Sequence, residues 1–383
     1  MLIIYLMFNM KDRKEEKMIG KQKFYSLKNI LSKNAQYNII IGERSNGKTY
    51  AVLKYAIEKY AKNREQTAIV RRWSDDFIGK RGTVMFNALV SNGEITKITS
   101  GEWTDVYYYG SRWFLCRYDE SGKRETDETP FCFGFSISAM EHDKSTSYPN
   151  ITTICFDEFL TRSAYLQDEF VLFMNVISTI VRHRTNVKIF MLGNTVNKYC
   201  PYFAEMGLSH IKEMKQGDID VYRYGDSELL VAVEYCNTSN KSEKASDLYF
   251  AFDNPKLSMI TCGSWEIDIY PHCPVKYKPC EILFTYFILF NGDMLQCEIV
   301  QHDNIIFTFI HRKTSDLKNT DDDLIYTPDF NPRPNYKRKI TKPTTPIEKK
   351  IAMFFINDKI FYQDNEIGEI VRNYLIWCGK DMK

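Results

Sequence analysis

The chain of 383 residues has almost no net charge, because 51 lysines and arginines balance 49 acids to +2. Proteins that bind nucleic acid without regard to sequence depend on a basic surface, since contacts to phosphate and the release of counterions dominate such binding. The overall charge therefore gives no support for a nucleic-acid-binding protein. It does not exclude a protein that carries one or two basic loops and repeatedly releases its ligand.

Cysteine pairs are also missing. The ten cysteines are scattered without a C-x-x-C pair, and the chain has no secretory signal, so we expect reduced thiols in a cytosol. The spacing of Cys262, His272, Cys273 and Cys280 matches no common zinc site. The sequence therefore favours neither a disulfide-stabilised protein nor a zinc protein.

Long hydrophobic runs are absent as well. The apolar start MLIIYLMF is too short to cross a bilayer and lacks a cleavage signal, so we expect no membrane partner. We interpret residues 1–36 as an N-terminal leader, with Met10 or Met18 as alternative starts. With 44% hydrophobic and 26% charged residues, the composition and length are those of a soluble globular protein of two domains.

The most informative segment that the sequence does contain is GERSNGKT, which fits the phosphate-binding pattern G-x-x-x-x-G-K-[ST]. The apolar run from Tyr37 to Ile41 predicts a buried strand before it, and apolar residues at helical spacing predict a helix after it. In that setting the loop N–H groups and a helix N-terminus point at one anion. The predicted nucleotide-binding residues are Gly42, Glu43, Arg44, Ser45, Asn46, Gly47, Lys48 and Thr49.

Two of these residues have distinct expected roles. We expect the Lys48 ammonium to reach the β- and γ-phosphates of ATP, and the Thr49 hydroxyl to hold Mg²⁺. A surface turn that matches the pattern by accident is the alternative, and the flanking strand and helix argue against it.

A second predicted strand ends in two acids. Ile151 to Phe156 is apolar, and Asp157 and Glu158 follow it, where a parallel sheet presents side chains to a ligand. We expect Asp157 to bind Mg²⁺ directly or from the second shell, and Glu158 to activate the attacking water. A solvent-facing acidic pair is the alternative, which the preceding phosphate loop disfavours.

A third strand is predicted after a helix. Apolar residues at helical spacing run from Tyr165 to Arg184, and Val187 to Leu192 then predicts a strand that ends near Asn194. We expect Asn194 to orient the attacking water beside the γ-phosphate.

Two arginines, Arg182 and Arg184, precede this strand. An arginine that reaches the phosphates of a neighbouring subunit stabilises the charge of the transition state. The alternative for both is a solvated helix C-terminus, where the helix dipole favours positive charge.

In their order and spacing, GERSNGKT, TTICFDEF, VRHRTN, IFMLGNT and NKYCPYF resemble the DNA-packaging ATPases of phi29-type tailed phages. The resemblance covers residues 39–203. It implies an α/β fold, in which an additional-strand P-loop ATPase domain with a parallel-type sheet flanked by helices precedes a smaller strand-rich domain. That C-terminal domain would resemble a vestigial RNase H-like nuclease domain. We assign the additional strand to TPFCFGFSI, residues 129–137.

The resemblance also implies an ATPase that uses ATP and Mg²⁺ to drive double-stranded DNA into a preformed capsid. Such proteins form a homopentameric ring on the portal vertex, so the implied partners are portal and capsid proteins or a structural RNA. The isolated protein would be a monomer. It would act in the host bacterial cytoplasm and transiently on the viral procapsid, with Arg184, or failing that Arg182, in the neighbouring subunit's site.

The polar run NTSNKSEKASD, residues 237–247, marks the predicted domain boundary. We expect an ATPase domain over residues 37–197, a linker over 198–247 and a C-terminal docking domain over 248–383. After the basic segment from Arg333 to Lys350, two short strands and a final helix are predicted. That segment either binds nucleic acid or is a solvated linker.

Other basic residues are candidates for touching DNA. They are Arg71, Arg72, Lys80, Arg81 and Lys144. For each of them, a solvated loop charge is the alternative.

Three functions are consistent with the sequence, and the motifs favour a DNA translocase. A terminase that also cuts DNA would need carboxylates that converge on two metals. No persuasive motif joins the available aspartates, Asp253, Asp268, Asp293 and Asp303. The third function, a nucleotide-binding adaptor that does not turn over, is disfavoured by the acidic pair after the second strand.

Overall fold

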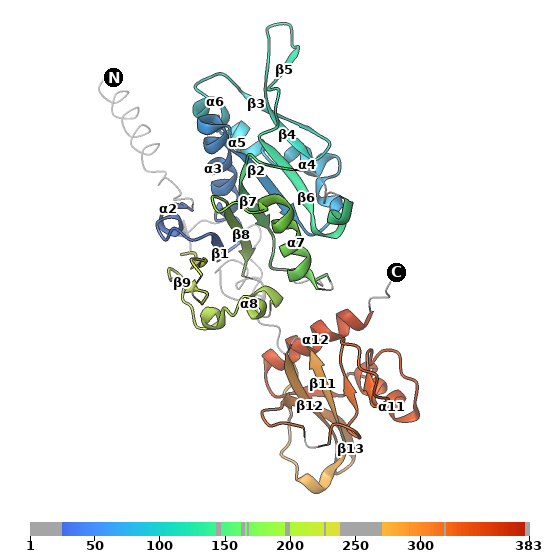
Figure 1. The fold of residues 1–383 in the computed structure, drawn as a ribbon. Coiled ribbons are helices and arrows are strands. Elements are labelled where there is room, and N and C mark those ends of the chain that lie inside the picture. The colour runs from blue at the N-terminus through green and yellow to red at the C-terminus, as the bar shows by residue number, and fades with distance from the viewer. Residues whose placement is uncertain are drawn as a thin grey trace, which may run out of the picture. The chain divides into compact units, whose positions relative to one another are not determined.

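The strands between Tyr37 and Tyr235 form one large sheet, and helices connect many of them (Figure 1). The computed structural model describes residues 25–142, 147–161, 165–166, 168–195, 200–225, 227–237, 270–290, 292–317 and 319–379. Residues 1–24 of the predicted leader, Lys144 and the segment 238–269, with Asp253, Cys262 and Asp268, lie outside them.

The described residues place ten strands in this sheet: β1 (Tyr37–Gly42), β2 (Gln66–Arg71), β3 (Asp105–Tyr109), β4 (Arg112–Tyr118), β5 (Arg124–Thr126), β6 (Cys132–Ser136), β7 (Ile151–Asp157), β8 (Lys188–Asn194), β9 (Ile219–Arg223) and β10 (Leu230–Tyr235). The α-helices between and around them are α2 (Lys28–Leu31), α3 (Lys48–Asn63), α4 (Lys80–Val84), α5 (Asn87–Ser91), α6 (Glu94–Ile98), α7 (Glu169–Val181) and α8 (Pro201–Glu205). Short 3₁₀ turns are η1 (Ser74–Phe77), η2 (Ile137–His142) and η3 (Ser209–Lys212).

The strand order is β3-β4-β6-β2-β7-β8-β1-β10-β9, with β5 paired to β4. The strands from β6 to β10 in this order run parallel to one another, and the outer strands are antiparallel. Because β8 separates the P-loop strand β1 from the acidic strand β7, β8 is the additional strand. The assignment of that role to residues 129–137 is wrong, since β6 lies on the far side of β2.

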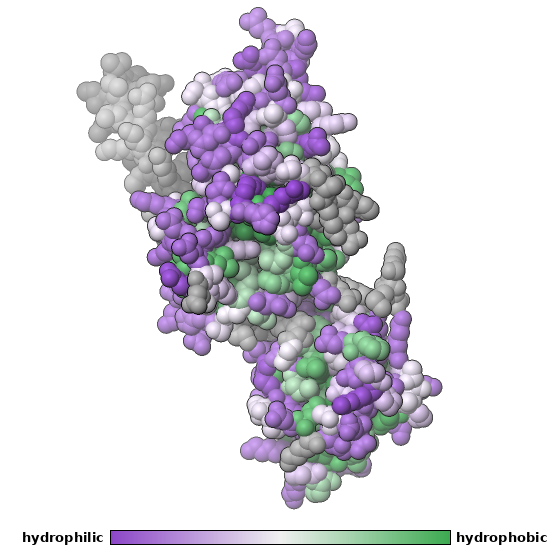
Figure 2. Space-filling view, in the orientation of Figure 1, coloured by the Kyte–Doolittle hydropathy of each residue, from purple (hydrophilic) through white to green (hydrophobic). Residues whose placement is uncertain are grey.

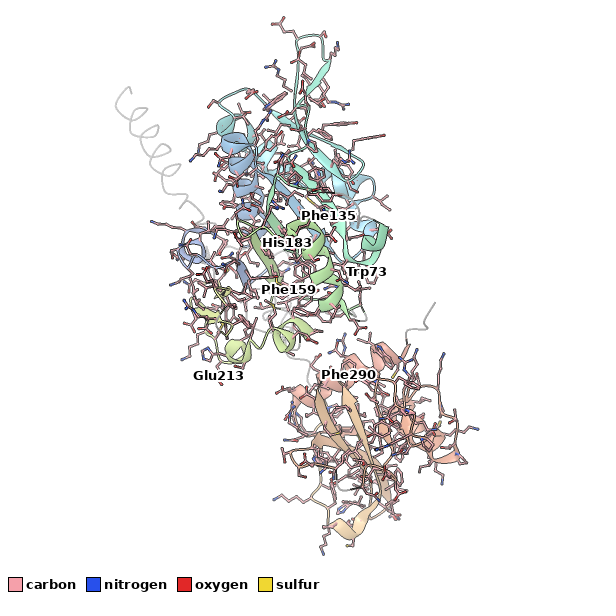
Figure 3. The ribbon with its side chains drawn as sticks, viewed as in Figure 1. Trp73, Phe135, Phe159, His183, Glu213 and Phe290 are labelled. Carbon is pink, nitrogen blue, oxygen red and sulfur yellow. The ribbon has the colours of Figure 1, made fainter. Side chains whose placement is uncertain are left out.

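Both faces of the parallel strands are buried, which explains their nearly continuous apolar sequences. Ile39 to Ile41 in β1 have no exposed surface. Val52 of α3 packs in the cluster on one face, and on the other Phe156 of β7 lies 4.8 Å from Phe173 of α7 between ring centroids. Figure 3 shows the side chains of this unit, with the buried Phe135 and Phe159 labelled. The three predicted strands that lead to the site are confirmed as β1, β7 and β8.

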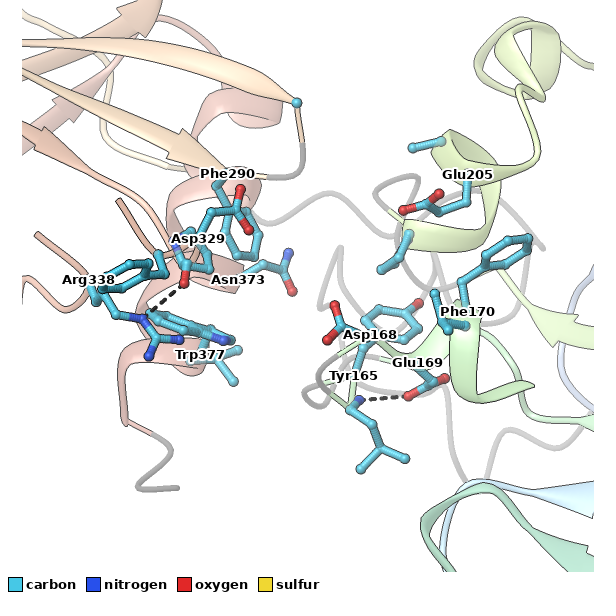
Figure 4. A pocket seen from close by; sticks show the side chains of 18 residues that line it. Tyr165, Asp168, Glu169, Phe170, Glu205, Phe290, Asp329, Arg338, Asn373 and Trp377 are labelled. Carbon is cyan, nitrogen blue, oxygen red and sulfur yellow. Dashed lines mark hydrogen bonds between the residues drawn. The ribbon is translucent and has the colours of Figure 1, made fainter. Parts of the chain in front are cut away.

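The helix α7 begins at a buried acid, Glu169. The N–H of Leu166 donates to Glu169 Oε2 at 2.7 Å (Figure 4), and the Tyr202 hydroxyl donates to Oε1 at 2.9 Å. These bonds satisfy a carboxylate that would otherwise be costly to bury. The helix is therefore shorter than the predicted span from Tyr165 to Arg184, because the chain before Glu169 is used to cap it.

Residues on both sides of the predicted ATPase domain belong to its core. Leu27, Ile30 and Ala35 are buried in the cluster that includes Ala232 of β10. The prediction of a leader over residues 1–36 is therefore wrong from residue 25 onward. The linker predicted over 198–247 is wrong where it includes β9 and β10, because β10 pairs with β1 and extends the sheet.

The chain splits into two compact units, and the second contains a six-stranded sheet. The second unit includes α8, and its described elements after residue 266 are η4 (Pro279–Glu281), β11 (Ile282–Phe290), β12 (Asp293–His302), β13 (Ile305–Arg312), β14 (Ile325–Tyr326), β15 (Tyr336–Lys337), α11 (Pro346–Ile356), β16 (Ile360–Tyr362) and α12 (Asn365–Gly379). The order is β15-β14-β11-β12-β13-β16, with β11 to β13 antiparallel and β14 and β15 parallel to β11. This is the RNase H-like arrangement that the resemblance implies.

The end of the second unit differs from the prediction of two short strands. The Thr345 hydroxyl accepts the N–H of Glu348 at 3.3 Å and caps α11, which continues through the apolar segment from Ile351 to Ile356. One short strand, β16, then precedes α12 in the described residues. Among all the residues that the structure describes, no helix has the length and apolar character needed to cross a membrane.

Candidate nucleotide-binding site

The carboxyl ends of the parallel strands bring the predicted site residues to one edge of the sheet. Gly42 at the end of β1 lies opposite Asn194 at the end of β8, and Asp157 ends β7. Ligands of open α/β sheets bind outside these strand ends. The residues that line the open cleft here are Arg44, Ser45, Asn46, Gly47, Lys48, Thr49, Tyr50, Asp157, Glu158, Leu192, Gly193 and Asn194.

The two glycines of the loop serve different purposes. Gly47 has φ 92°, a left-handed conformation that glycine adopts without steric cost, and α3 begins at the next residue. Gly42 is needed for space, because a Cβ there would lie 2.9 Å from the Cβ of Cys236. The sequence pattern thus reflects both backbone conformation and packing.

The Lys48 side chain is buried inside the loop. Its Nζ donates to the carbonyls of Glu43 at 2.7 Å and Gly42 at 3.3 Å. It also donates to the amide oxygens of Asn46 at 3.2 Å and Asn194 at 3.3 Å. Burial lowers the pKa of the ammonium from 10.5 to about 8. A positive charge held away from water gains more from an anion than an exposed charge does.

Thr49 and Asp157 place two oxygens side by side. The Thr49 hydroxyl donates to Asp157 Oδ1 at 3.2 Å. Burial raises the pKa of Asp157, and the positive charge of Arg71 opposes that rise. A hydroxyl and a carboxylate next to a phosphate-binding loop form the oxygen donor set that Mg²⁺ prefers, so these residues fit a magnesium nucleotide.

Arg71, at the end of β2, joins both acids of the site. Its Nη2 lies 2.8 Å from Asp157 Oδ2, and its Nη1 lies 2.8 Å from Glu158 Oε2. Burial disfavours the charged guanidinium, but the two acids outweigh this effect and raise its pKa. From the sequence, Arg71 was a candidate for a DNA contact, with a solvated loop charge as the alternative. A basic residue at a strand end was the available signal, but the sequence does not show that β2 lies beside β7.

The two acids lie in different environments. Asp157 is buried, whereas the Glu158 side chain is 61% exposed. Glu158 has φ 61°, which is uncommon for a residue with a side chain. Arg72 holds this turn, because its guanidinium donates to the carbonyls of Glu158 at 3.3 Å and Phe159 at 2.9 Å. The chain therefore buries one carboxylate and presents the other to the cleft.

Arg184 lies apart from these residues, at the opposite edge of the sheet. It contacts the start of β7 near Ile151, about 20 Å along the strand from Asp157. All five N–H groups of a guanidinium are used, because they donate to the carbonyls of Tyr148, Pro149, Ile151, Ile180 and Val181 at 2.6 to 3.3 Å.

This arrangement argues against Arg184 as an arginine that reaches a neighbouring subunit's nucleotide, since no N–H remains for a phosphate. Its side chain instead ties the end of α7 to the start of β7. Arg182, two residues earlier, is exposed. The other predicted site residues lie together at the phosphate loop and the ends of β7 and β8.

Comparisons with known proteins agree with this fold. A family model described as "Podovirus DNA encapsidation protein (Gp16)" matches residues 19–110 and 121–245. The DNA packaging protein of Bacillus phage phi29 is 31% identical over 195 residues, which are 50% of this chain and 52% of that protein. The match therefore spans about half the length of this curated relative.

Two solved structures share the fold over most of the chain. "The Phi-28 gp11 DNA packaging Motor" has a TM-score of 0.57 at 16% identity and covers 95% of this chain and 100% of that chain. "The bacteriophage Phi-29 viral genome packaging motor assembly" has a TM-score of 0.57 at 22% identity and covers 91% of this chain and 96% of that chain. At these identities the likeness concerns the fold.

Proposed function

Because the chain belongs to the family of podovirus DNA encapsidation proteins, we propose that it is an ATP-driven motor that moves double-stranded DNA into a preformed capsid. One observation carries the proposal. The hydroxyl oxygen of the phosphate-loop residue Thr49 lies 3.2 Å from Asp157 Oδ1, in the cleft that Lys48 and Glu158 also line. A cleft that combines a buried lysine, an oxygen pair for Mg²⁺ and an exposed acid has the groups that phosphoryl transfer to water requires.

The side chains of the cleft divide this chemistry among them. The loop N–H groups and Lys48 bind phosphate, and Thr49 and Asp157 hold Mg²⁺. ATP and Mg²⁺, when bound, supply the phosphoryl group and neutralise its charge. Glu158 accepts the proton of the attacking water, and Asn194 orients that water.

The arginine that acts between subunits is placed at Arg182 in this proposal. The guanidinium of Arg184 donates to carbonyls of its own chain, which leaves Arg182 as the alternative that the resemblance implies. An arginine supplied by a neighbour accelerates phosphoryl transfer about a thousandfold or more. This role requires an assembly of subunits, which by the resemblance is a homopentameric ring on the portal vertex, with the isolated protein a monomer.

The second unit docks the motor and does not cut DNA. Its central strand β11, ILFTYFILF, carries no carboxylate, although two-metal cutting needs carboxylates that converge on the metals. Asp293 is paired with Arg312, and Asp303 is exposed. Portal and capsid proteins, or a structural RNA, are the docking partners. The protein acts in the host bacterial cytoplasm and, during packaging, on the procapsid.

Steady-state ATP turnover with and without DNA-free procapsids tests the motor. Lys48→Ala is expected to lose binding and turnover together, because the lysine contacts phosphate in both the ground state and the transition state. Glu158→Gln keeps the size of the side chain but loses its basicity, so binding is retained and hydrolysis is lost. Absence of ATP turnover by the wild type on procapsids refutes the proposal.

Mixed rings test the shared site. Arg182→Ala and Lys48→Ala subunits are each inactive alone, but a mixed ring contains sites with one intact lysine and one intact neighbouring arginine. Partial turnover is expected, and no activity beyond that of the separate variants removes Arg182 from the mechanism. Docking without cutting is tested by incubating the full chain with supercoiled DNA and Mn²⁺, where nicking refutes it.

A further inference from the structure

An aromatic and basic surface at the edge of the large sheet is not used by the nucleotide site. Its members come from β3, β4 and β5, and we call them the aromatic face: Tyr107, Tyr109, Arg112, Phe114, Tyr118 and Arg124. The strand registers put them on one side of the sheet. Tyr107 lies opposite Phe114, Tyr109 opposite Arg112, and Tyr118 opposite Arg124, and residues directly opposite each other share a face.

The other side of the same strands is core. Trp113 and Leu115 of β4 are buried in the cluster that contains Leu53 of α3 and Leu89 of α5. On the aromatic face, by contrast, Tyr109 is 70% exposed and Tyr118 is 53% exposed. Figure 1 shows α7 near β7 and β8 and away from β3 and β5. Trp113 and Leu115 of β4 therefore face the core, whereas Arg112 and Tyr118 at the two ends of the other side are exposed and Cys116 between them is buried.

The rings on this surface are already arranged in layers. Tyr107 and Tyr109 stack with centroids 6.5 Å apart and planes 9° from parallel. The guanidinium carbon of Arg124 lies 3.4 Å from the centroid of the Tyr107 ring. Figure 2 shows this end of the unit mostly in purple and white, in contrast to the green area near α7, as polar and aromatic residues would appear. Parallel rings and planar cations offer flat surfaces on which another flat group can stack.

The charges of the surface select an anionic partner. Beside Arg112 and Arg124, the described residues of β3, β4 and β5 place one acid on this side of the sheet, Asp105, whose Oδ1 accepts the N–H of Val106 at 2.7 Å. The face is therefore basic although the whole chain has a net charge of only +2. Single-stranded nucleic acid supplies both complements, because its phosphates pair with arginine and its unpaired bases stack on aromatic rings. A duplex keeps its bases stacked inside and offers the face only phosphates.

We infer that the aromatic face binds single-stranded DNA, with bases on Tyr107, Tyr109 and Tyr118 and phosphates on Arg112 and Arg124. The choice of DNA rests on the proposed function, and a frayed end is the form in which packaged duplex exposes unpaired bases. The family model passes over residues 111–120, which contain all of β4, and it matches the residues of β3 and β5.

Fluorescence anisotropy with a labelled oligo(dT) of about 12 nucleotides tests the inference on the full chain, since single-strand sites span roughly 4–16 nucleotides. Tyr109→Ala is expected to weaken binding about fivefold or more, because one stacked base is lost. Arg124→Ala weakens binding and reduces its salt dependence. Arg117→Ala is the matched control. It removes the same charge from β4, the strand paired with β5, but its side chain pairs with Glu125 and lies over Trp103 on the opposite side.

Each other result overturns the inference. Wild-type affinity in Tyr109→Ala excludes stacking, and equal loss in Arg117→Ala shows a diffuse charge effect. Equally tight binding of duplex DNA shows contacts to phosphate alone, and binding of oligo(U) without oligo(dT) assigns the face to RNA.

ATP turnover is measured on the same samples. If Tyr109→Ala and Arg124→Ala lose oligonucleotide binding but keep normal ATP turnover, the aromatic face is a site separate from the nucleotide site. If the wild type hydrolyses no ATP, the proposed motor function is refuted, and the binding of oligo(dT) is judged from the anisotropy data alone.

Discussion

Arg71→Ala is expected to destabilise the first unit by about 3 to 5 kcal/mol, because it leaves a buried carboxylate without its partner. The Arg71 side chain is 17% exposed and that of Asp157 is 9% exposed, so solvent screens their interaction little. For a unit of roughly 200 residues, one kcal/mol corresponds to about 2–4 °C in Tm. The expected fall in Tm is therefore on the order of 10 °C.

This loss of stability depends on pH. Burial raises the pKa of Asp157, so the folded protein favours the protonated acid and stability falls as the pH rises through that pKa. The charge of Arg71 holds the pKa lower than burial alone would. In Arg71→Ala the pKa rises further. The difference in stability between wild type and variant therefore grows toward pH 8 and shrinks near pH 4, about the pKa of the carboxyl in an unfolded chain.

Urea unfolding followed by circular dichroism at about pH 4.5 and about pH 8 checks this expectation, with the pH values chosen to bracket the usual carboxyl range and neutrality. Arg81→Ala is the control, because Arg81 is 67% exposed and lies 3.8 Å from Asp76, where a pair contributes less than about 1 kcal/mol. Adding Asp157→Asn to Arg71→Ala removes the buried charge and should recover part of the loss. A loss of equal size at both pH values, with no recovery in the double variant, refutes the reasoning.

Three further predictions concern the loop and the end of α7. Gly42→Ala should weaken nucleotide binding and destabilise the protein by about 1–3 kcal/mol, because the new Cβ meets Cys236, and adding Cys236→Gly should restore part of both in calorimetry and unfolding. Affinity for nucleotide should fall about fivefold between pH 8 and pH 9, because the Lys48 ammonium with a pKa of about 8 loses its charge, and Lys48→Arg should titrate without this fall. Arg184→Ala should lower Tm rather than slow turnover selectively, because five carbonyls lose their donor; unchanged Tm would contradict the role given to it here.

The part of the site that lies within one strand–loop–helix unit was predictable from the sequence. The loop from Gly42 to Thr49 is specified by local pattern, and Asp157 and Asn194 follow because parallel strands end at one edge. The contribution of Arg71 was not predictable, because it depends on β2 lying beside β7, which is set by packing between distant segments.

The role of Arg184 could not be predicted from its position in the sequence. The sequence places it after a helix and before a strand, but it does not show that loop carbonyls near Tyr148 and Ile151 will surround its guanidinium. The linker prediction was wrong over β9 and β10 for a related reason. The pairing of β10 with β1 could not be read from the residues of β10 alone.

The position of β10 has a mechanical consequence. The N–H of Cys236, the residue directly after β10, donates to the Ile41 carbonyl at 2.8 Å, one residue before Gly42 of the phosphate loop. A shift of the phosphate-loop backbone would therefore reach Cys236, at the end of β10, through this hydrogen bond and through the close packing of Gly42 against the Cys236 side chain.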